Sequence, residues 1–520
     1  MTLTALLEAS AARAPDALAL VAADGGGRVT WSGFVAAARR LAMGFARQGI
    51  GPGDRVALWC PNRPEHLIAQ FALARLGAAT IHINTRFVAA DVAGLLDRAR
   101  PSAVVAAFGF PGMNTTEILA EILPDTRAPL RFILGLDAGG IAEIAGVPVL
   151  PWAELDASPE RHADDSAPDA LCLTFTTSGT TAGPKLVAHT QAAIATHARD
   201  VAARTGTGEA DAAVLAIVPL CGTFGLSLAM AGIAGGARIV TMARFDAAAA
   251  DTLIREQKIT HMVGGDDLLL RLAEAAGGRP HAPFLFTGFA SFHPGADRVV
   301  DICGALNMAP RGVYGSSECQ ALFALQDPAD PIRCRIGGGT PASGAAGIRA
   351  RDIETGLVAE AGELEFSGPS LFMGYLGDPA ATARARTADG WFRSGDFGRM
   401  HPGAGFDYET RLGDALRLGG FLVAPEEIEA FLKQQPGVAE AQVVGARGGS
   451  IAVAFVSGDA PDPVVLAAAC TEHLARFKQP SRIIPIDAFP VTDGPNGQKI
   501  QRGKLREMAE AALAAEMAQA

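Results

Sequence analysis

Hydroxyl side chains, glycines and one lysine follow an apolar run in the first half of the chain. The run Ala170 to Phe175 predicts a buried strand, which leads into Thr174-Phe-Thr-Thr-Ser-Gly-Thr-Thr-Ala-Gly-Pro-Lys185. The glycines let backbone N–H groups turn toward an anion, and the hydroxyls add further donors. We therefore expect a phosphate-binding loop whose candidate contacts are Thr177, Ser178, Gly179, Thr180, Thr181 and Lys185.

The loop does not fit the phosphate-binding motif of kinases. That motif ends in Gly-Lys-Ser/Thr, whereas Pro184 precedes the lysine here and Leu186 follows it. The chain also has no Gly-x-Ser-x-Gly nucleophile elbow. These patterns favour chemistry at a phosphate that depends on positioning and charge neutralisation rather than on a protein nucleophile.

Four later clusters combine glycines with charged or aromatic residues. They are Tyr314-Gly-Ser-Ser-Glu318, Gly390-Trp-Phe-Arg-Ser-Gly-Asp396, Arg411-Leu-Gly-Asp-Ala-Leu-Arg-Leu-Gly-Gly420 and Gly497-Gln-Lys-Ile-Gln-Arg502. Each has an ordinary structural explanation when taken alone: a helix-capping acid, a core aromatic, a Gly-Asp turn or a solvated lysine. Their combination in this order and spacing is much more specific.

With Gly53-Asp-Arg-Val-Ala-Leu and Leu76-Gly-Ala, these clusters resemble the adenylate-forming family of acyl-CoA synthetases, peptide-synthetase adenylation domains and beetle luciferases. The resemblance covers about Ser32 to Lys504. Members let a carboxylate attack the α-phosphate of ATP, release pyrophosphate and pass the acyl group to a thiol. The resemblance therefore implies an AMP-forming acid–CoA ligase that uses ATP, Mg²⁺ and coenzyme A.

The resemblance also assigns roles in nucleotide binding. The Thr177 to Lys185 loop is expected to hold the triphosphate. Glu318 is expected to be a catalytic residue and the Mg²⁺ ligand, because a carboxylate suits this hard cation. Asp396 is expected to accept the ribose hydroxyls, with Arg411 reaching the ribose or a phosphate. Tyr314 is expected to stack on adenine, and the remaining residues of its cluster are Gly315, Ser316 and Ser317.

Further roles fall on the end of the chain. Lys499 is expected to bridge the substrate carboxylate and the α-phosphate, with Lys504 as the rival for this role. Gly413 and Asp414 are expected to form the hinge of a mobile tail domain. The pair Gly419-Gly420 is expected to line the channel for coenzyme A.

Several positions depart from the family pattern. Ala182 and Leu186 replace two glycines of the phosphate loop, and Gln498 stands between Gly497 and Lys499. Gly413 stands where relatives carry Asp or Lys, which removes a side chain that would favour one hinge state.

The acyl pocket is expected to accept a neutral acid, fatty or aromatic. Cys221 and Gly222 stand where many relatives have an aromatic residue and a histidine, which indicates a roomier pocket. The run Ala212 to Ala237 carries no charge that could pair with a substrate ammonium. The expected lining residues are Cys221, Gly222, Phe224, Thr287, Gly288, Phe289 and Gln320.

Composition excludes several other classes of protein. A chain of 520 residues is too long to fold around a single hydrophobic core, so we expect two or more domains. Its net charge of -11 argues against a nucleic-acid partner. Seven scattered cysteines without a CxxC pair indicate reduced thiols in a cytoplasmic protein. The start lacks signal-peptide character, and Pro219 with several glycines argues against a transmembrane reading of Ala212 to Ala237.

Apolar runs alternate with helical periodicity over most of the chain, which predicts an α/β fold of doubly wound sheets. Short glycine-punctuated strands from Arg333 to Met400 predict a small β-barrel-like subdomain. We divide the chain into an N-terminal domain of residues 1–411 and a small mobile α+β domain of residues 412–520. Two alternatives to a CoA ligase stay open, namely an acyl-AMP ligase serving a carrier protein and an inactive nucleotide-binding paralogue.

Overall fold

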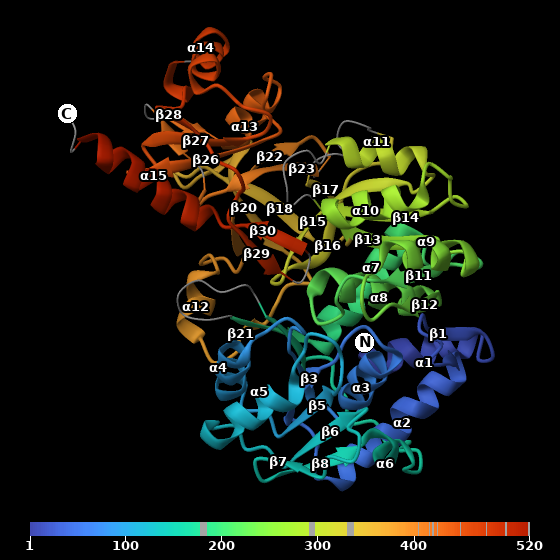
Figure 1. Ribbon diagram of the computed structural model, residues 1–520. Helices are drawn as coiled ribbons and strands as arrows, with labels where there is room; N and C mark the ends of the chain where they lie inside the picture. The colour runs from blue at the N-terminus through green and yellow to red at the C-terminus, as the bar shows by residue number, and fades with distance from the viewer. Residues whose placement is uncertain are drawn as a thin grey trace.

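The computed structural model describes residues 1–176, 185–290, 297–329, 337–403, 405–414, 416–418, 421–423, 425–447, 449–474, 476–494 and 497–517. Within these ranges two large sheets alternate with layers of helices, and a smaller tail domain follows (Figure 1). The α/β fold class predicted from the sequence is confirmed.

The helices of the described residues occur in every part of the chain. They are α1 (Leu3–Arg13), α2 (Trp31–Arg47), α3 (Pro64–Arg75), α4 (Ala89–Ala99), α5 (Thr115–Ile122), η1 (Leu123–Asp125), α6 (Trp152–Asp156), α7 (Gln191–Thr205), α8 (Thr223–Gly235), α9 (Ala247–Glu256), α10 (Asp266–Ala276), α11 (Asp297–Ala305), α12 (Pro379–Arg384), α13 (Pro425–Lys433), α14 (Pro463–His473), η3 (Arg476–Lys478) and α15 (Arg502–Met517).

The larger sheet has fourteen strands in the part of the chain that the structure describes. Their spatial order is β19 (Val358–Ala359), β18 (Gly347–Arg351), β20 (Ala361–Ser367), β22 (Phe392–His401), β23 (Gly405–Arg411), β17 (Gly338–Pro341), β16 (Gln320–Leu325), β15 (Pro310–Ser316), β14 (Phe286–Ala290), β13 (His261–Gly265), β11 (Ala213–Ala216), β12 (Arg238–Thr241), β1 (Leu18–Ala22) and β2 (Arg28–Thr30). The strands from β15 to β1 pair in parallel, and the others pair antiparallel.

The smaller sheet contains nine strands within the described ranges. Their order is β21 (Gly374–Tyr375), β10 (Leu186–Thr190), β9 (Leu171–Thr176), β4 (Ala79–His82), β3 (Arg55–Trp59), β5 (Ala103–Ala107), β6 (Phe132–Leu136), β8 (Val147–Pro151) and β7 (Glu143–Ile144). Its centre is parallel, while β10 turns back antiparallel to β9.

Three hydrophobic clusters hold these layers together. The largest lies between the sheets and takes the buried faces of α1, α2, α3, α7 and α8. A second covers the outer face of the larger sheet with α9, α10 and α11, and a third covers the outer face of the smaller sheet with α4 and α5. Because the central parallel strands are covered on both faces, most of their residues are apolar.

The uncharged run that resembled a membrane span is β11 followed by α8. Pro219 lies in the loop between them, and nearly the whole of α8 is buried in the cluster between the sheets. No described helix is long and apolar enough to cross a membrane.

The antiparallel strands after Gly338 do not form a closed barrel, which corrects that part of the prediction. They extend the edge of the larger sheet, in the order β19, β18, β20, β22, β23 and β17. Glycine-punctuated strands predict antiparallel pairing, but closure depends on strand tilt and stagger that local sequence does not carry.

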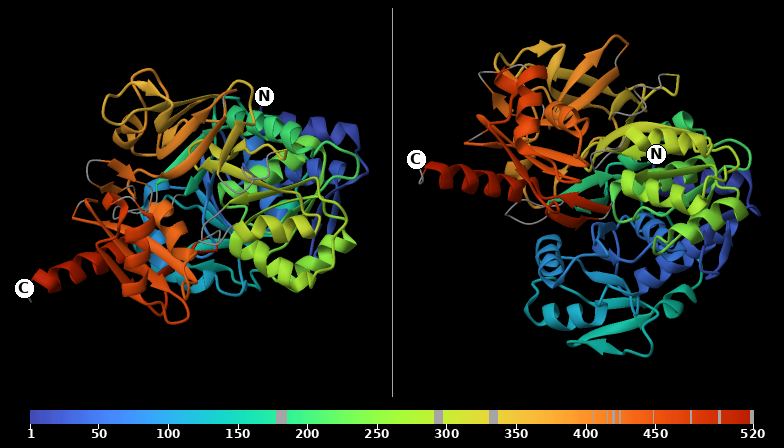
Figure 2. Two further views of the ribbon diagram at one scale, coloured as in Figure 1. Left: turned by 90° about the horizontal axis from the view of Figure 1, so that it is seen from above. Right: turned by 45° about the horizontal axis from the view of Figure 1, so that its top comes forward.

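The tail contains its own hydrophobic clusters, built from residues between Leu416 and Leu513. Its strands are β24 (Leu416–Leu418), β25 (Phe421–Val423), β26 (Glu440–Ala446), β27 (Ile451–Ser457), β28 (Arg482–Pro485), β29 (Val491–Gly494) and β30 (Gly497–Ile500). The β29–β30 hairpin, red in Figure 2, extends from the tail toward the N-terminal domain. The division at residue 411 stays a prediction.

Candidate active site

The predicted phosphate-binding loop connects the neighbouring strands β9 and β10. The strands pair antiparallel, with Thr176 opposite Leu186. Thr177, Ser178, Gly179, Thr180 and Thr181 lie outside the described residues, so their phosphate contacts stay predictions. Lys185, directly before β10, is described and its side chain is exposed.

Lys185 lies beside a tyrosine that contacts Glu318. The Lys185 ammonium is 4.6 Å from the centre of the Tyr375 ring, within the range of a cation–π contact. The Tyr375 hydroxyl donates to Glu318 Oε1 at 2.9 Å. The pairing of β21 with β10 brings Tyr375 to this place. Three segments far apart in the sequence therefore meet around the predicted phosphate-binding lysine.

Glu318 lies in the tight turn between β15 and β16. Ser316 Oγ accepts from the Glu318 N–H at 3.2 Å and from the Cys319 N–H at 3.4 Å. A Cβ atom at Gly315 would lie 2.5 Å from the Ala321 backbone. Glycine is therefore required where β15 and β16 approach each other. The carbonyl of Ser317 accepts a hydrogen bond from His189 Nε2 at 2.7 Å.

Asp396, Tyr314 and Arg411 form a second cluster, on the larger sheet. The Tyr314 hydroxyl donates to Asp396 Oδ2 at 2.5 Å, and Arg411 donates to Asp396 Oδ1 at 2.5 Å. Asp396 and Arg411 face each other across the β22–β23 pair. The Tyr314 ring packs against Phe366 and Phe406 and is 7% exposed, so most of it is core.

Burial and charge act in opposite directions on Asp396. Burial raises the pKa of its carboxyl group, and the Arg411 guanidinium partly lowers it. Burial and the negative charge of Asp396 raise the pKa of Tyr314 well above its ordinary value. Tyr314 therefore stays a protonated donor. Since each carboxylate oxygen has two lone pairs, Asp396 keeps acceptor capacity for ribose hydroxyls.

The structure separates the predicted acyl-pocket residues into two groups. Phe224, at the start of α8, and Gly288 face the cluster between the sheets. Thr287 pairs with Met262 on the opposite face, and Phe289 packs in the outer cluster. Side chains alternate along a strand, so Thr287 and Phe289 lie on the other side of the sheet from Phe224.

Of the remaining predicted lining residues, Cys221 and Gly222 lie directly before α8, and Gln320 begins β16, which packs against α8. Cys221 is buried, and burial raises the pKa of its thiol to about 11, so it is uncharged at neutral pH. A Cβ atom at Gly222 would have only the Pro219 carbonyl within 4 Å, at 3.6 Å. The Gln320 amide donates to the backbone carbonyls of Ala193 and Ser370, so it holds backbone in place.

The predicted hinge is fastened to the last helix. Arg506 of α15 donates to the Gly413 carbonyl at 2.8 Å and pairs with the Asp414 carboxylate. The Gly413 backbone is exposed, and a Cβ atom there would meet nothing within 4 Å. Gly419 and Gly420 lie outside the described residues.

Lys499 lies on β30 of the tail, where it pairs with Thr492. Lys504, its rival for the catalytic role, lies on α15 with an exposed side chain. Near them Arg502 is ion-paired with Glu429 at 2.8 Å. The basic run of the sequence is thus divided between a hairpin and a helix.

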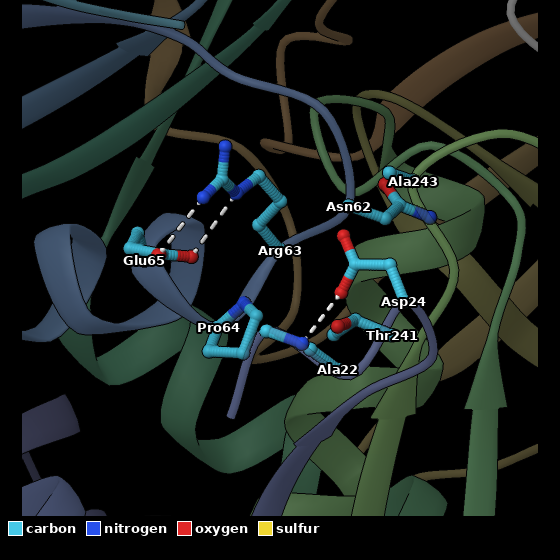
Figure 3. A pocket seen from close by; sticks show the side chains of 9 residues that line it. Ala22, Asp24, Asn62, Arg63, Pro64, Glu65, Thr241 and Ala243 are labelled. Carbon is cyan, nitrogen blue, oxygen red and sulfur yellow. Dashed lines mark hydrogen bonds and ion pairs between the residues drawn. The ribbon is translucent and has the colours of Figure 1, made fainter. Parts of the chain in front are cut away.

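A separate pocket lies between the β1–β2 turn and the start of α3. Figure 3 shows Asp24, Asn62 and Thr241 at its wall, with Arg63 in a two-pronged ion pair to Glu65. Its cavity volume is about 10 Å³. That is room for about one water molecule. We assign it no ligand.

Comparison with known proteins identifies the family. The AMP-binding enzyme family matches residues 7–376, and the AMP-binding enzyme C-terminal domain matches residues 427–494. The chain therefore belongs to the AMP-binding enzyme family, as the sequence motifs predicted.

Its curated relatives include several CoA ligases. A 2-hydroxy-7-methoxy-5-methyl-1-naphthoate–CoA ligase of Streptomyces carzinostaticus is 31% identical, over 97% of this chain and 92% of the relative. A methyl-dioxo-octahydroindenyl propanoyl:CoA ligase of Mycobacterium tuberculosis is 30% identical, over 98% of this chain and 99% of the relative. Among solved structures, ATP-bound MatB from Rhodopseudomonas palustris is 24% identical and shares the fold, with a TM-score of 0.83 over 98% of this chain and 99% of its own.

Two contacts at the site were missed by the motif analysis. Tyr375 contacts both Lys185 and Glu318, and its only sequence signal is the glycine-tyrosine pair at 374–375. His189 contacts the Ser317 carbonyl, and a histidine in an apolar strand is the only hint of it.

Proposed function

We propose that this enzyme activates a carboxylic acid with Mg·ATP, through an acyl-adenylate, and transfers the acyl group to coenzyme A. The observation that carries the proposal is the meeting of Lys185, Tyr375 and Glu318 from three separate segments. A cation and a carboxylate side by side suit a magnesium triphosphate, because one binds phosphate oxygens and the other binds the metal. The similarity to named CoA ligases supports the same reaction.

The donors around Glu318 fit a magnesium ion that is held mainly by the nucleotide. Tyr375 occupies one carboxylate oxygen, and no group of three His, Cys, Asp or Glu residues within the described ranges is arranged for a metal. Mg²⁺ commonly uses one or two carboxylates together with substrate phosphates. When bound, it would neutralise phosphate charge during carboxylate attack.

The roles of this chain's residues then divide between the two clusters. Lys185 would hold the outer phosphates, while Asp396 would accept the ribose hydroxyls with Arg411 beside it. Lys499 would arrive from the tail to act where negative charge develops at the α-phosphate. Rotation about Gly413 and Asp414 would then exchange this lysine for the Gly419-Gly420 channel.

We propose a neutral acid, fatty or aromatic, as the substrate. Buried Phe224, neutral Cys221 and the uncharged α8 offer no charged partner, and a buried unpaired ammonium would be costly. We place the enzyme in the cytoplasm because the six cysteines that the structure describes are free, buried thiols.

An ATP–pyrophosphate exchange assay over fatty, aromatic and dicarboxylic acids tests this function. Exchange with an uncharged acyl chain, followed by thioester formation with coenzyme A, is the expected result. Exchange without transfer to coenzyme A, but with transfer to a carrier protein, would identify the acyl-AMP ligase instead. Absence of exchange with every acid, while ATP binding is retained, would identify the inactive nucleotide-binding paralogue.

We expect Asp396→Asn to raise the KM for ATP in exchange by about 10- to 100-fold, because charged hydrogen bonds contribute about 1.5–3 kcal/mol each. An amide offers one acceptor oxygen in place of two, so Tyr314 and Arg411 would no longer both be satisfied.

Asp389→Asn is the matched control for this change. Asp389 also pairs with an arginine, Arg349, but its side chain is 55% exposed on the outer surface. The KM of the Asp389→Asn variant for ATP should stay at the wild-type value. Equal KM values for ATP in the two variants would contradict the assignment of Asp396 to the nucleotide site.

A further inference from the structure

The chain is strained where the turn that carries Glu318 leads into β16. Gln320 and Leu322 have positive φ angles of 67° and 63°, and both side chains are buried. A residue with a Cβ atom avoids this left-handed region, and such a conformation persists where surrounding contacts impose it. Something around the turn must therefore hold it in place.

Two histidine side chains form hydrogen bonds to backbone carbonyls in this turn and at the start of β16. His189 Nε2 lies 2.7 Å from the Ser317 carbonyl, and His197 Nε2 lies 2.7 Å from the Ala321 carbonyl. A carbonyl oxygen only accepts, so each imidazole donates its Nε2–H. His189 Nδ1 has no partner among the described residues, so no competing contact turns the ring. Burial lowers the pKa of both histidines to about 4, which keeps them neutral at physiological pH.

The contact of His189 acts directly on Glu318. The Ser317 carbonyl and the Glu318 N–H belong to one planar peptide group. His189 holds its oxygen, and Ser316 Oγ holds its N–H at 3.2 Å. With both ends fixed, the plane cannot rotate, and its orientation sets the direction in which the Glu318 side chain leaves the backbone.

The same strand connects this contact to the phosphate-binding loop. His189 lies on β10, four residues after Lys185, and α7 with His197 follows directly. On the other side of the turn the Phe372 N–H donates to the Glu318 carbonyl at 2.7 Å, and Tyr375 donates to its carboxylate. The segment from Lys185 to His189 thus carries the lysine and also helps to orient the Glu318 carboxylate.

We propose that His189 is a positioning residue, whose Nε2–H holds the Ser317–Glu318 peptide in the orientation that turns the Glu318 carboxylate toward Lys185 and the metal–triphosphate. His197 secures the Ala321 carbonyl at the start of β16, directly after this turn. The inference rests on the proposed role of Glu318 as a magnesium ligand. Partners of metal ligands typically contribute about 10- to 100-fold to metal affinity.

The test compares four variants. His189→Gln keeps an N–H donor near the place of Nε2, whereas His189→Asn is too short and His189→Leu has no donor. His66→Leu is the matched control, because His66 is an equally buried histidine whose ring bonds the Cys60 carbonyl, away from the turn. Thermal unfolding measures the stability lost in each.

Calorimetric titration of ATP at a series of Mg²⁺ concentrations reads the metal dependence without an acid substrate. His189→Leu and His189→Asn should raise the Mg²⁺ concentration for half-maximal ATP binding about 10-fold, with ATP affinity in EDTA unchanged. For His189→Gln, the Mg²⁺ concentration for half-maximal ATP binding should lie within about threefold of the wild-type value. His66→Leu should match wild type even if its melting temperature falls equally.

A wild-type Mg²⁺ dependence in His189→Asn, or an equal increase in His66→Leu, would overturn the inference. If His189→Leu does not fold, the pair His189→Asn and His189→Gln decides between the outcomes. ATP binding without any Mg²⁺ dependence in the wild type would overturn it together with the role of Glu318. Failure of every acid in the exchange assay would reject only the proposed function, since this titration needs no acid.

Discussion

Lys499→Ala is expected to slow acid-dependent ATP–pyrophosphate exchange by about 10² to 10³. A preorganised charge at a developing oxyanion contributes an effect of this size to the rate. Lys499 lies on the β29–β30 hairpin, which extends from the tail toward the N-terminal domain (Figure 2). Transfer of preformed acyl-AMP to coenzyme A should be largely intact, because the bond to the α-phosphate already exists. Single-turnover assays of the two half-reactions separate these effects.

Lys504→Ala is the control for this prediction. Lys504 comes five residues later on the exposed face of α15, so its loss should leave both half-reactions near the wild-type rate. Full exchange in Lys499→Ala, or an equal loss in Lys504→Ala, would remove Lys499 from its assigned role.

Gly420→Leu should show the reverse pattern. This residue lies outside the described ranges, so the expectation rests on the family resemblance, which places it in the channel for the pantetheine arm. A leucine there should obstruct the thiol and spare adenylation. Loss of both half-reactions to the same extent would contradict the channel assignment.

A second large effect is expected on mild acidification. His66, His82, His189 and His197 are buried between the sheets, and burial lowers their pKa values from 6.5 to about 4, or to about 3 for His82. The unfolded chain binds protons below pH 6.5 that the folded chain does not. Stability is therefore present above pH 6.5 and is lost as the pH falls from there toward 4.

The size of this loss follows from proton linkage. Between pH 7.5 and 5.5 each buried imidazole should remove about 1.4 kcal/mol from the free energy of unfolding, or about 5 to 6 kcal/mol for all four. This window stays above the ordinary pKa of carboxyl groups, which limits their contribution. Since domains are commonly stable by about 5–15 kcal/mol, the N-terminal domain should become marginal at pH 5.5.

Urea unfolding followed by tryptophan fluorescence measures this effect in the right part of the chain, because all four tryptophans precede Arg411. His82→Phe is a suitable variant, since the His82 ring already stacks between His66 and Phe175. Between pH 7.5 and 5.5, the free energy of unfolding of His82→Phe should fall by about a quarter less than that of the wild type. A free energy of unfolding that does not change from pH 7.5 to 5.5 would contradict the prediction.

Local patterns were enough to predict the layers of the fold. The runs that became β3, β4 and β9 are largely buried on both faces, and that burial is why most of their residues are apolar. The uncharged run of β11 and α8 was interpreted as core because Pro219 and several glycines interrupt it, and nearly all of α8 is buried between the sheets. The prediction of a barrel was wrong, because the strands after Gly338 carry ordinary antiparallel patterns, and closure depends on their mutual tilt.

The sequence by itself determined the family and the chemical types at the site, since Lys185, Glu318, Asp396 and Arg411 stand in motifs whose order and spacing are specific. Only the tertiary structure decided how they are held. Tyr375 reaches Glu318 from 57 residues away because β21 pairs with β10, and His189 reaches Ser317 across 128 residues. Hydrogen bonds of this kind depend on which strands become neighbours, and no local pattern records that choice. Phe289 shows the same limit, since the alternation of side chains along β14 places it in the outer cluster, on the other side of the sheet from Phe224.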